Sequence, residues 1–157
     1  MFWEEFSMST VTICEYHLEV NIDTPVSLVW GSFCFEIANW WPKPMMATPD
    51  GEMVLEPVLG GKLFEDSGNG CGVHWFSIVA IEEETLIEFV GTLTPAFGGP
   101  AQVFLTLKFD GFGERTVLKI SDQSVGRERD QSAVVAGWEE VFDALKQYCE
   151  SGEGQMP

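Results

Sequence analysis

Residues 130–150 read DQSAVVAGWEEVFDALKQYCE and carry the clearest structural pattern in the chain. Apolar residues recur there at helical spacing and fall on a single stripe, formed by Val134, Trp138, Val141, Phe142, Leu145 and Cys149. Asp130 or Ser132 can cap the start of this helix, and Gly152 can end it. At about 1.5 Å per residue the helix spans on the order of 30 Å, which is long enough to lie across a whole sheet.

Most of the remaining chain predicts strands. Residues 11–22 alternate between apolar and polar side chains, as expected for a long, half-buried strand. Its apolar face comprises Cys14, Tyr16, Leu18, Val20 and Ile22. Six further short strands, separated by hairpin turn residues, are expected at 52–57, 62–66, 71–82, 86–92, 102–110 and 115–123. Hairpin connections of this kind indicate an antiparallel meander.

Two short helices are predicted between the first strand and the meander. Asp23 or Thr24 can cap a helix over 26–35, in which Pro25 at the first turn loses no useful N–H. A second helix over 36–40 ends before a Trp-Trp-Pro sequence, because the residue before proline leaves the helical region.

The order of elements predicts an α+β fold with a seven-stranded antiparallel sheet and a long C-terminal helix. Sheets of this size twist and curl, so a straight helix touches the sheet along only part of its length. The two short helices then plug the remaining opening. This topology favours an internal cavity.

Composition fits one domain with a hydrophobic core. The chain has 157 residues, of which 45% are hydrophobic, and we expect a loose N-terminal end at 1–10, one domain at 11–151 and a tail at 152–157. The net charge of −17 disfavours nucleic acid and anionic lipid surfaces as partners.

No apolar run approaches the ~20 residues of a membrane helix, and the N-terminus lacks a signal-peptide pattern, so we expect a cytoplasmic protein.

Metal and redox chemistry are not expected. The four cysteines, Cys14, Cys34, Cys71 and Cys149, lie far apart and form no C-x-x-C pair, which predicts neither a zinc site nor a redox motif. Reduced, buried thiols are the favoured expectation in a cytosolic chain. The sequence also lacks a ligand-spaced acidic loop and a phosphate-binding loop, so we expect no metal and no cofactor.

Three segments resemble the START-like, SRPBCC-type superfamily, and within it the branch named for activators of the heat-shock-protein ATPase. In chain order they are Thr24-Pro25 with Val29-Trp30 and Trp40-Trp41-Pro42, the double-glycine hairpin LEPVLGGKLFE at 55–65, and GWEEVFDALK at 137–146. The resemblance implies a helix-grip fold like that of the birch-pollen-allergen-like proteins. In that fold a curved seven-stranded sheet wraps around the long helix, and two short helices close an apolar cavity. Residues 71–75 and 95–100 depart from the family pattern.

Aromatic residues are the candidate lining of such a cavity, since the chain has six Trp and twelve Phe. The candidate ligand-binding residues are Trp30, Trp41, Phe64, Trp75, Phe76, Phe89, Phe104, Trp138 and Phe142. A pocket of rings with few polar groups suits a flat or greasy ligand. Gly137, inside the long helix, either permits close packing or leaves room for a ligand.

His74 is considered as a general acid or base, since histidine titrates near neutral pH. It is a weak candidate because no serine, cysteine or aspartate is tied to it by a recognisable spacing. Cys71 lies three residues earlier, which along a strand places it on the opposite face. A lone histidine more often serves as a structural donor, and no catalytic residue is assigned.

Three functions remain open. The favoured one is binding of a hydrophobic small molecule (a lipid, an aromatic or a polyketide-like metabolite), with gates at 42–51 and 96–100. A cyclase or dehydratase is the first alternative and needs two polar side chains that converge in the pocket. The evident suppliers are His74, Tyr16, Asp122 and Glu88. A co-chaperone-like interaction module is the second alternative and would use an exposed apolar patch, with Trp3 and Phe6 available to dock across a homodimer.

Overall fold

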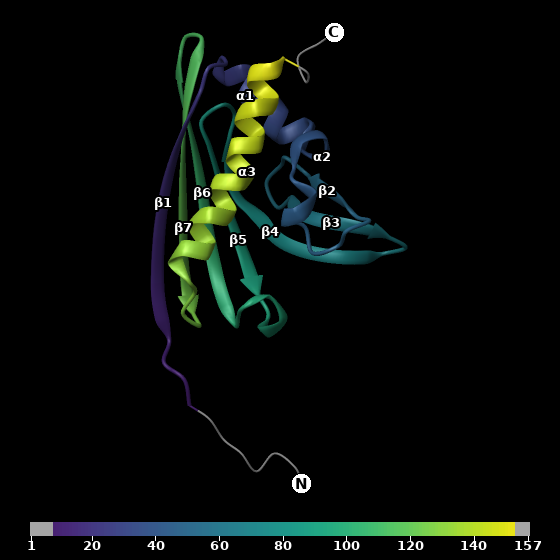
Figure 1. Cartoon of the computed structure of the whole chain (residues 1–157), viewed down its shortest axis with the longest axis vertical. Coiled ribbons are helices and arrows are strands. Elements are labelled where there is room, and N and C mark those ends of the chain that lie inside the picture. Colours follow the sequence, from purple (N-terminus) through teal and green to yellow (C-terminus); the bar gives the residue numbers. More distant parts are fainter. Residues whose placement is uncertain (1–7, 153–157) are drawn as a thin grey trace.

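A curved antiparallel sheet of seven strands wraps around one long helix (Figure 1). The computed structural model describes residues 8–152, so the N-terminal aromatic residues Phe2, Trp3 and Phe6 lie outside the described part of the chain. In chain order the elements are β1 (Thr12–Ile22), α1 (Val26–Phe35), α2 (Ile37–Trp40), η1 (Lys43–Met45), β2 (Glu52–Leu55), β3 (Lys62–Gly68), β4 (Cys71–Glu82), β5 (Leu86–Leu93), η2 (Pro95–Phe97), β6 (Ala101–Phe112), β7 (Arg115–Gly126) and α3 (Gln131–Ser151). The predicted α+β class, with seven strands, two short helices and a long C-terminal helix, is confirmed.

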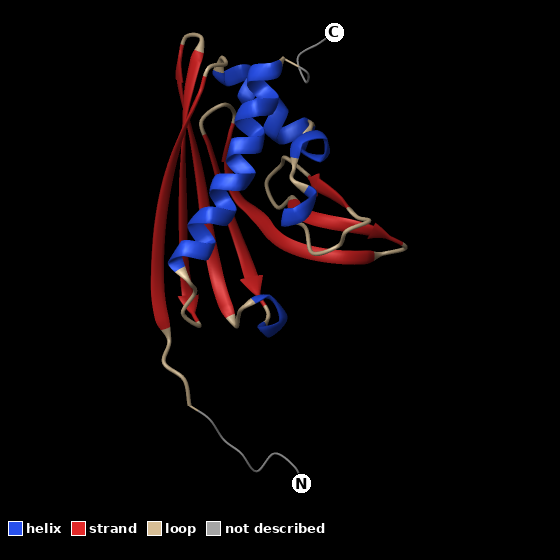
Figure 2. Ribbon diagram, in the orientation of Figure 1, coloured by secondary structure: helices blue, strands red, loops and turns tan. Residues whose placement is uncertain are grey.

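The sheet has the strand order β1-β7-β6-β5-β4-β3-β2, and all neighbouring strands are antiparallel. Strands β2 to β7 form the predicted meander, and its last strand, β7, pairs with the first strand, β1, along the whole length of β1. Figure 2 shows β4 bending so that β2 and β3 lie at a steep angle to β1 and β7. The sheet therefore forms a trough, with α3 on its concave side.

The ends of α3 follow from its sequence. The side chain of Asp130 accepts a hydrogen bond from the backbone N–H of Ser132 at 3.0 Å, which confirms the predicted N-cap. Gly152 ends the helix with a φ of +77°, a left-handed conformation that favours glycine.

The predicted cap of α1 is wrong. Pro25 takes the N-cap position, and no side chain caps this helix. The predicted caps, Asp23 and Thr24, both lie before this position, and the Asp23 backbone N–H donates to Glu150 Oε2 near the end of α3 at 2.8 Å. The connection between β1 and α1 is thus tied to the end of α3, while α1 itself has no side-chain cap.

Helix α3 packs in two halves. Toward its C-terminus, Phe142 and Cys149 are buried, and Phe142 stacks on Phe33 of α1 with 6.4 Å between ring centroids. Toward its N-terminus, Val134 and Trp138 are only half-buried, although they belong to the same apolar stripe. The helix therefore contacts the core closely along only part of its length.

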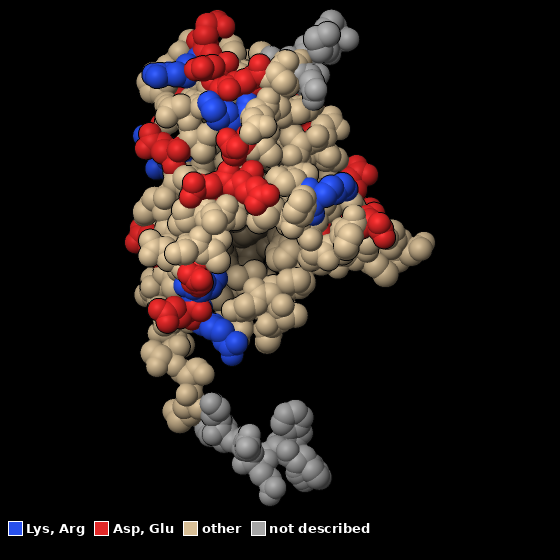
Figure 3. Space-filling model, in the orientation of Figure 1, with Lys and Arg blue, Asp and Glu red and all other residues tan. Residues whose placement is uncertain are grey.

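Charged side chains lie mainly on the outside. Figure 3 shows acidic side chains gathered over α3, whose polar face carries Glu139, Glu140 and Asp143. Among residues 8–152, no helix combines the length and the apolar character needed to cross a membrane.

Candidate functional site

A cavity of about 230 Å³ lies between the N-terminal half of α3 and the concave face of the sheet. Figure 3 shows the surface hollowed beside this part of the helix. Its wall is mostly apolar and consists of Trp41, Met45, Leu63, Trp75, Phe76, Leu93, Val103, Asp122, Arg129, Ala133, Val134, Gly137, Trp138 and Val141. An apolar cavity with a few polar groups is the usual form of a small-molecule site.

Trp75 and Phe76 are neighbours on β4, and both border the cavity. In a regular strand two adjacent side chains face opposite sides of the sheet. Here Leu63 of β3 pairs with Phe76 and Phe64 pairs with His74, so Trp75 has no opposite residue on β3. This β-bulge allows Trp75 to face the same side as Phe76.

Glu65 of β3 is a fully buried carboxylate that joins two walls of the cavity. Its Oε2 accepts from the indole N–H of Trp75 at 2.7 Å and from the backbone N–H of Ala47 at 3.0 Å. Its Oε1 accepts from the backbone N–H of Thr48 at 2.7 Å and from the Thr48 hydroxyl at 2.6 Å. Glu65 therefore holds the 42–51 loop against β3 and β4.

The charge of Glu65 is stabilised by these contacts. Burial by itself raises the pKa of Glu65, but the hydrogen bonds from Thr48, Ala47 and Trp75 outweigh burial and hold the pKa below its ordinary value of 4.5. Sequence reasoning missed this residue. The available signal was the spacing of Leu63 and Glu65, which places both on the inward face of β3.

A second buried carboxylate, Asp122 of β7, forms an ion pair with Arg129 in the connection between β7 and α3. The side chains of Asp122 and Arg129 are 2% and 11% exposed. Arg129 Nη2 donates to Asp122 Oδ1, while the indole N–H of Trp138 donates to Oδ2 at 2.8 Å. Arg129 Nε donates to the Ser124 hydroxyl at 3.1 Å, and the guanidinium lies 5.5 Å from the centre of the Tyr16 ring. This network joins β1, β7 and α3 at one polar end of the cavity.

Two loops border the cavity at 42–51 and 96–100, where the sequence predicts gates. Met45 of η1 lines the cavity, and its Cε lies 3.3 Å from the position that a Cβ on Gly137 would occupy. Phe97 of η2 packs edge-on against Trp75, with 5.0 Å between ring centroids. Both loops thus touch residues of the cavity wall.

The nine predicted ligand-binding residues fall into three groups. Those that line the cavity are Trp41, Trp75, Phe76 and Trp138. Those buried in the core outside the cavity wall are Trp30, Phe89 and Phe142. Phe64 is half-buried and Phe104 is 43% exposed, because alternation along β3 and β6 gives the inward positions to Leu63, Val103 and Leu105.

The residues considered for catalysis do not gather in the cavity. His74 is exposed, with its Nε2 3.0 Å from Ser77 Oγ, and Glu88 is exposed on β5. Tyr16 donates its hydroxyl to the backbone carbonyl of Arg129 at 2.9 Å, and Asp122 lines the cavity. Within residues 8–152, no three side chains of the kinds that bind metals converge.

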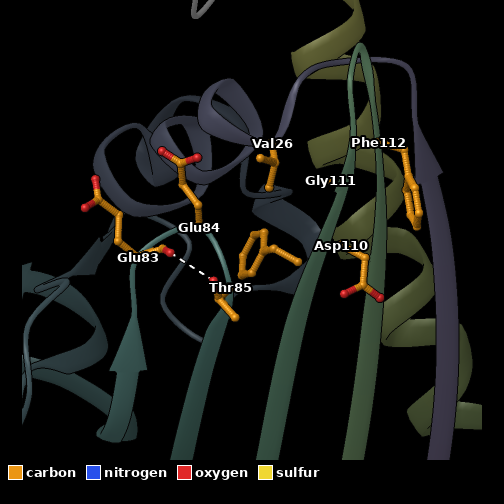
Figure 4. A pocket seen from close by; sticks show the side chains of 8 residues that line it. Val26, Glu83, Glu84, Thr85, Asp110, Gly111 and Phe112 are labelled. Carbon is orange, nitrogen blue, oxygen red and sulfur yellow. Dashed lines mark hydrogen bonds between the residues drawn. The ribbon is translucent and has the colours of Figure 1, made fainter.

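A wider depression of about 650 Å³ lies at the far end of the sheet, beside the start of α1. Figure 4 shows the carboxylates of Glu83 and Glu84 pointing away from Asp110 across it. Thr85 donates to the Glu83 carbonyl at 3.1 Å, and Asp110 pairs with Lys119 at 3.1 Å. These groups do not converge on a common point, so the smaller apolar cavity is the candidate site.

The cysteines differ in exposure, which yields a test. Cys34 is buried, and burial raises its pKa to about 12, whereas Cys71 is exposed. A maleimide at neutral pH should therefore modify Cys71 rapidly and Cys34 only after unfolding, because the thiolate is the reactive form. Peptide mapping by mass spectrometry identifies the modified residue. Cys71→Ser should lose the rapid reaction, and rapid labelling of native Cys34 would contradict the expectation.

A curved sheet that grips a long helix around an apolar cavity defines the START-like, helix-grip class of the SRPBCC superfamily, as the sequence resemblance predicts. The chain belongs to the family described as Activator of Hsp90 ATPase homolog 1-like protein, whose model matches residues 23–150. A comparison with curated proteins gave no match.

Solved structures share this fold at low sequence identity. An uncharacterized protein from Rhizobium leguminosarum is 15% identical with a TM-score of 0.68, and the match covers 91% of this chain and 99% of that one. CalU16 from Micromonospora echinospora is 17% identical with a TM-score of 0.62, covering 91% and 76%. Ara h 8.0201 is 16% identical with a TM-score of 0.60, covering 89% and 99%.

Proposed function

We propose that this protein binds a hydrophobic small molecule in the cavity between α3 and the sheet. The observation that carries the proposal is an apolar wall in which three indole rings surround about 230 Å³ of space. Apolar surface removed from water contributes about 25 cal/mol per Å², so a ligand that fills the cavity gains affinity mainly by burial. The family and fold support a ligand-binding scaffold but do not by themselves select the ligand.

The size of the cavity limits the classes of ligand that fit it. An engineered cavity of about 150 Å³ in another protein binds benzene. By comparison, about 230 Å³ suits a compact molecule of one or two rings better than a long acyl chain. Of the ligands considered from the sequence, an aromatic or polyketide-like metabolite therefore fits better than a lipid.

Native mass spectrometry of the purified protein is the direct test, followed by titration of emptied protein with naphthalene. We expect either a co-purified apolar compound released on denaturation or saturable binding of naphthalene that quenches tryptophan fluorescence. A protein that is purified empty and binds neither naphthalene nor other one- and two-ring compounds would overturn the proposal.

Filling the cavity from α3 should abolish binding. Gly137 lines the cavity, so the side chain of Gly137→Leu enters the space that a ligand would use and displaces the flexible end of Met45. We expect naphthalene affinity to fall by about ten-fold or more, equivalent to about 1.4 kcal/mol. Ala136→Leu is the matched control because Ala136 is exposed on the same helix. Equal affinities of the two variants would place the binding site elsewhere.

An enzyme that uses the same cavity is the second candidate. It is favoured by one observation, the presence of Asp122 and Arg129 in the cavity wall. These two groups hydrogen-bond to each other, and Asp122 also accepts from Trp138. Binding is preferred because neither group of this pair is left as a separate acid and base for proton transfer.

A further inference from the structure

The polar groups of the cavity wall are unevenly satisfied. Asp122, in the wall, and Glu65, which accepts from the wall residue Trp75, each have both carboxylate oxygens occupied. Glu65 receives four hydrogen bonds, and Asp122 receives bonds from Arg129 and Trp138. The wall therefore offers a ligand few acceptors.

Donors, in contrast, remain available. Three N–H groups of Arg129 are used, by Ser124 and by the two oxygens of Asp122. A guanidinium has five N–H groups, so two have no acceptor among the described residues. Trp41, which also lines the cavity, has a buried indole N–H that likewise lacks an acceptor within residues 8–152. A ligand for this wall must supply hydrogen-bond acceptors.

The charge of the acceptor is also constrained. Asp122 already neutralises Arg129, and both side chains are nearly buried. A ligand carboxylate beside Arg129 would place a second negative charge close to the Asp122 carboxylate, in a protein whose net charge is −17. Like charges in a poorly solvated site repel strongly. A carbonyl oxygen accepts the same hydrogen bonds without this repulsion.

We infer that Arg129 is the polar recognition point of the cavity and that the ligand is an uncharged, one- or two-ring molecule with a carbonyl oxygen directed at the guanidinium. This inference rests on the proposed function and specifies its ligand class. The apolar body lies against the tryptophan and aliphatic wall, and the carbonyl oxygen meets the donors that the protein leaves unpaired.

Three ligands with one ring system separate the alternatives: tetralin, tetralone and tetralin carboxylate, titrated by calorimetry into the whole protein. We expect tetralone to bind about ten-fold or more tightly than both others, since a hydrogen bond to a charged donor is among the stronger ones. Equal binding of tetralin and tetralone overturns the inference and leaves the proposed function standing. Tightest binding by the carboxylate also overturns it. Binding by none of the three contradicts both proposals.

A paired substitution locates the recognition point. Asp122→Asn with Arg129→Met removes both charges together and retains a side-chain acceptor at 122 for Trp138. In this double variant the affinity for tetralone should fall to that for tetralin, so that the preference for tetralone disappears. Arg115→Met is the control, since Arg115 lies over Phe112 at the distant end of β7. A preference that survives in the double variant overturns the inference, and if that variant does not fold, the three-ligand series decides alone.

Discussion

Asp122→Ala is expected to lower the free energy of unfolding by about 3–5 kcal/mol, because it leaves a nearly buried charge without its partner. Arg129 is only 11% exposed, and its Nη2 donates to Asp122 Oδ1. The substitution also removes the acceptor of the Trp138 indole N–H, which lies 2.8 Å from Oδ2. Urea denaturation followed by circular dichroism measures the loss.

The double variant that carries Asp122→Asn and Arg129→Met provides the comparison. Replacing both members of a buried pair is far less destabilising than removing one, since no charge remains unpaired. We therefore expect the double variant to be more stable than Asp122→Ala. A double variant less stable than Asp122→Ala would show that the ion pair itself, rather than avoidance of an unpaired charge, stabilises the fold.

Glu65→Ala is expected to lower the free energy of unfolding by roughly 3 kcal/mol. Four donors, from Ala47, Thr48 and Trp75, lose the buried Glu65 carboxylate as their acceptor. Glu52→Ala, on the neighbouring strand β2, is the matched control because Glu52 is exposed and should change stability by about 0.5 kcal/mol or less. An equal effect of the two substitutions would contradict the role given to Glu65.

The contribution of Glu65 should also depend on pH. Its pKa in the folded protein is held below 4.5, so folding favours the ionised form. The stabilisation is therefore fully present above pH 4.5 and is lost as the pH falls through the lower folded pKa. Relative to Glu65→Gln, which does not titrate, the unmodified protein should lose its advantage on acidification in this range. A difference in unfolding free energy that is constant with pH would contradict this linkage.

Periodic patterns predicted most elements of the fold. The apolar stripe of α3, its cap at Asp130 and its end at Gly152 all match the structure, because each depends on residues within a few positions of one another. The alternation in β1 likewise identified Cys14 and Tyr16 as buried. The cap of α1 was mispredicted because the helix begins at Val26, with Pro25 rather than Asp23 or Thr24 at the N-cap position.

The candidate site was predicted less completely. Trp41, Trp75, Phe76 and Trp138 were selected and do line the cavity, but Phe104 was selected as well and lies exposed. A count of aromatic residues does not distinguish the two faces of a strand. The alternation of side chains along a strand also fails to predict the cavity wall on β4, where the bulge allows the adjacent residues Trp75 and Phe76 to border the same space.

The sequence by itself determined the class of fold, the family and the apolar character of the interior, because periodicity and composition are local properties of the chain. Only the tertiary structure decided which rings border the cavity and which carboxylates support them. Glu65 of β3 accepts hydrogen bonds from Ala47 and Thr48 of the 42–51 loop, and Asp122 meets Arg129 across the β7–α3 connection. Buried charges require partners from separate segments, so their positions follow from strand register and packing rather than from any local pattern.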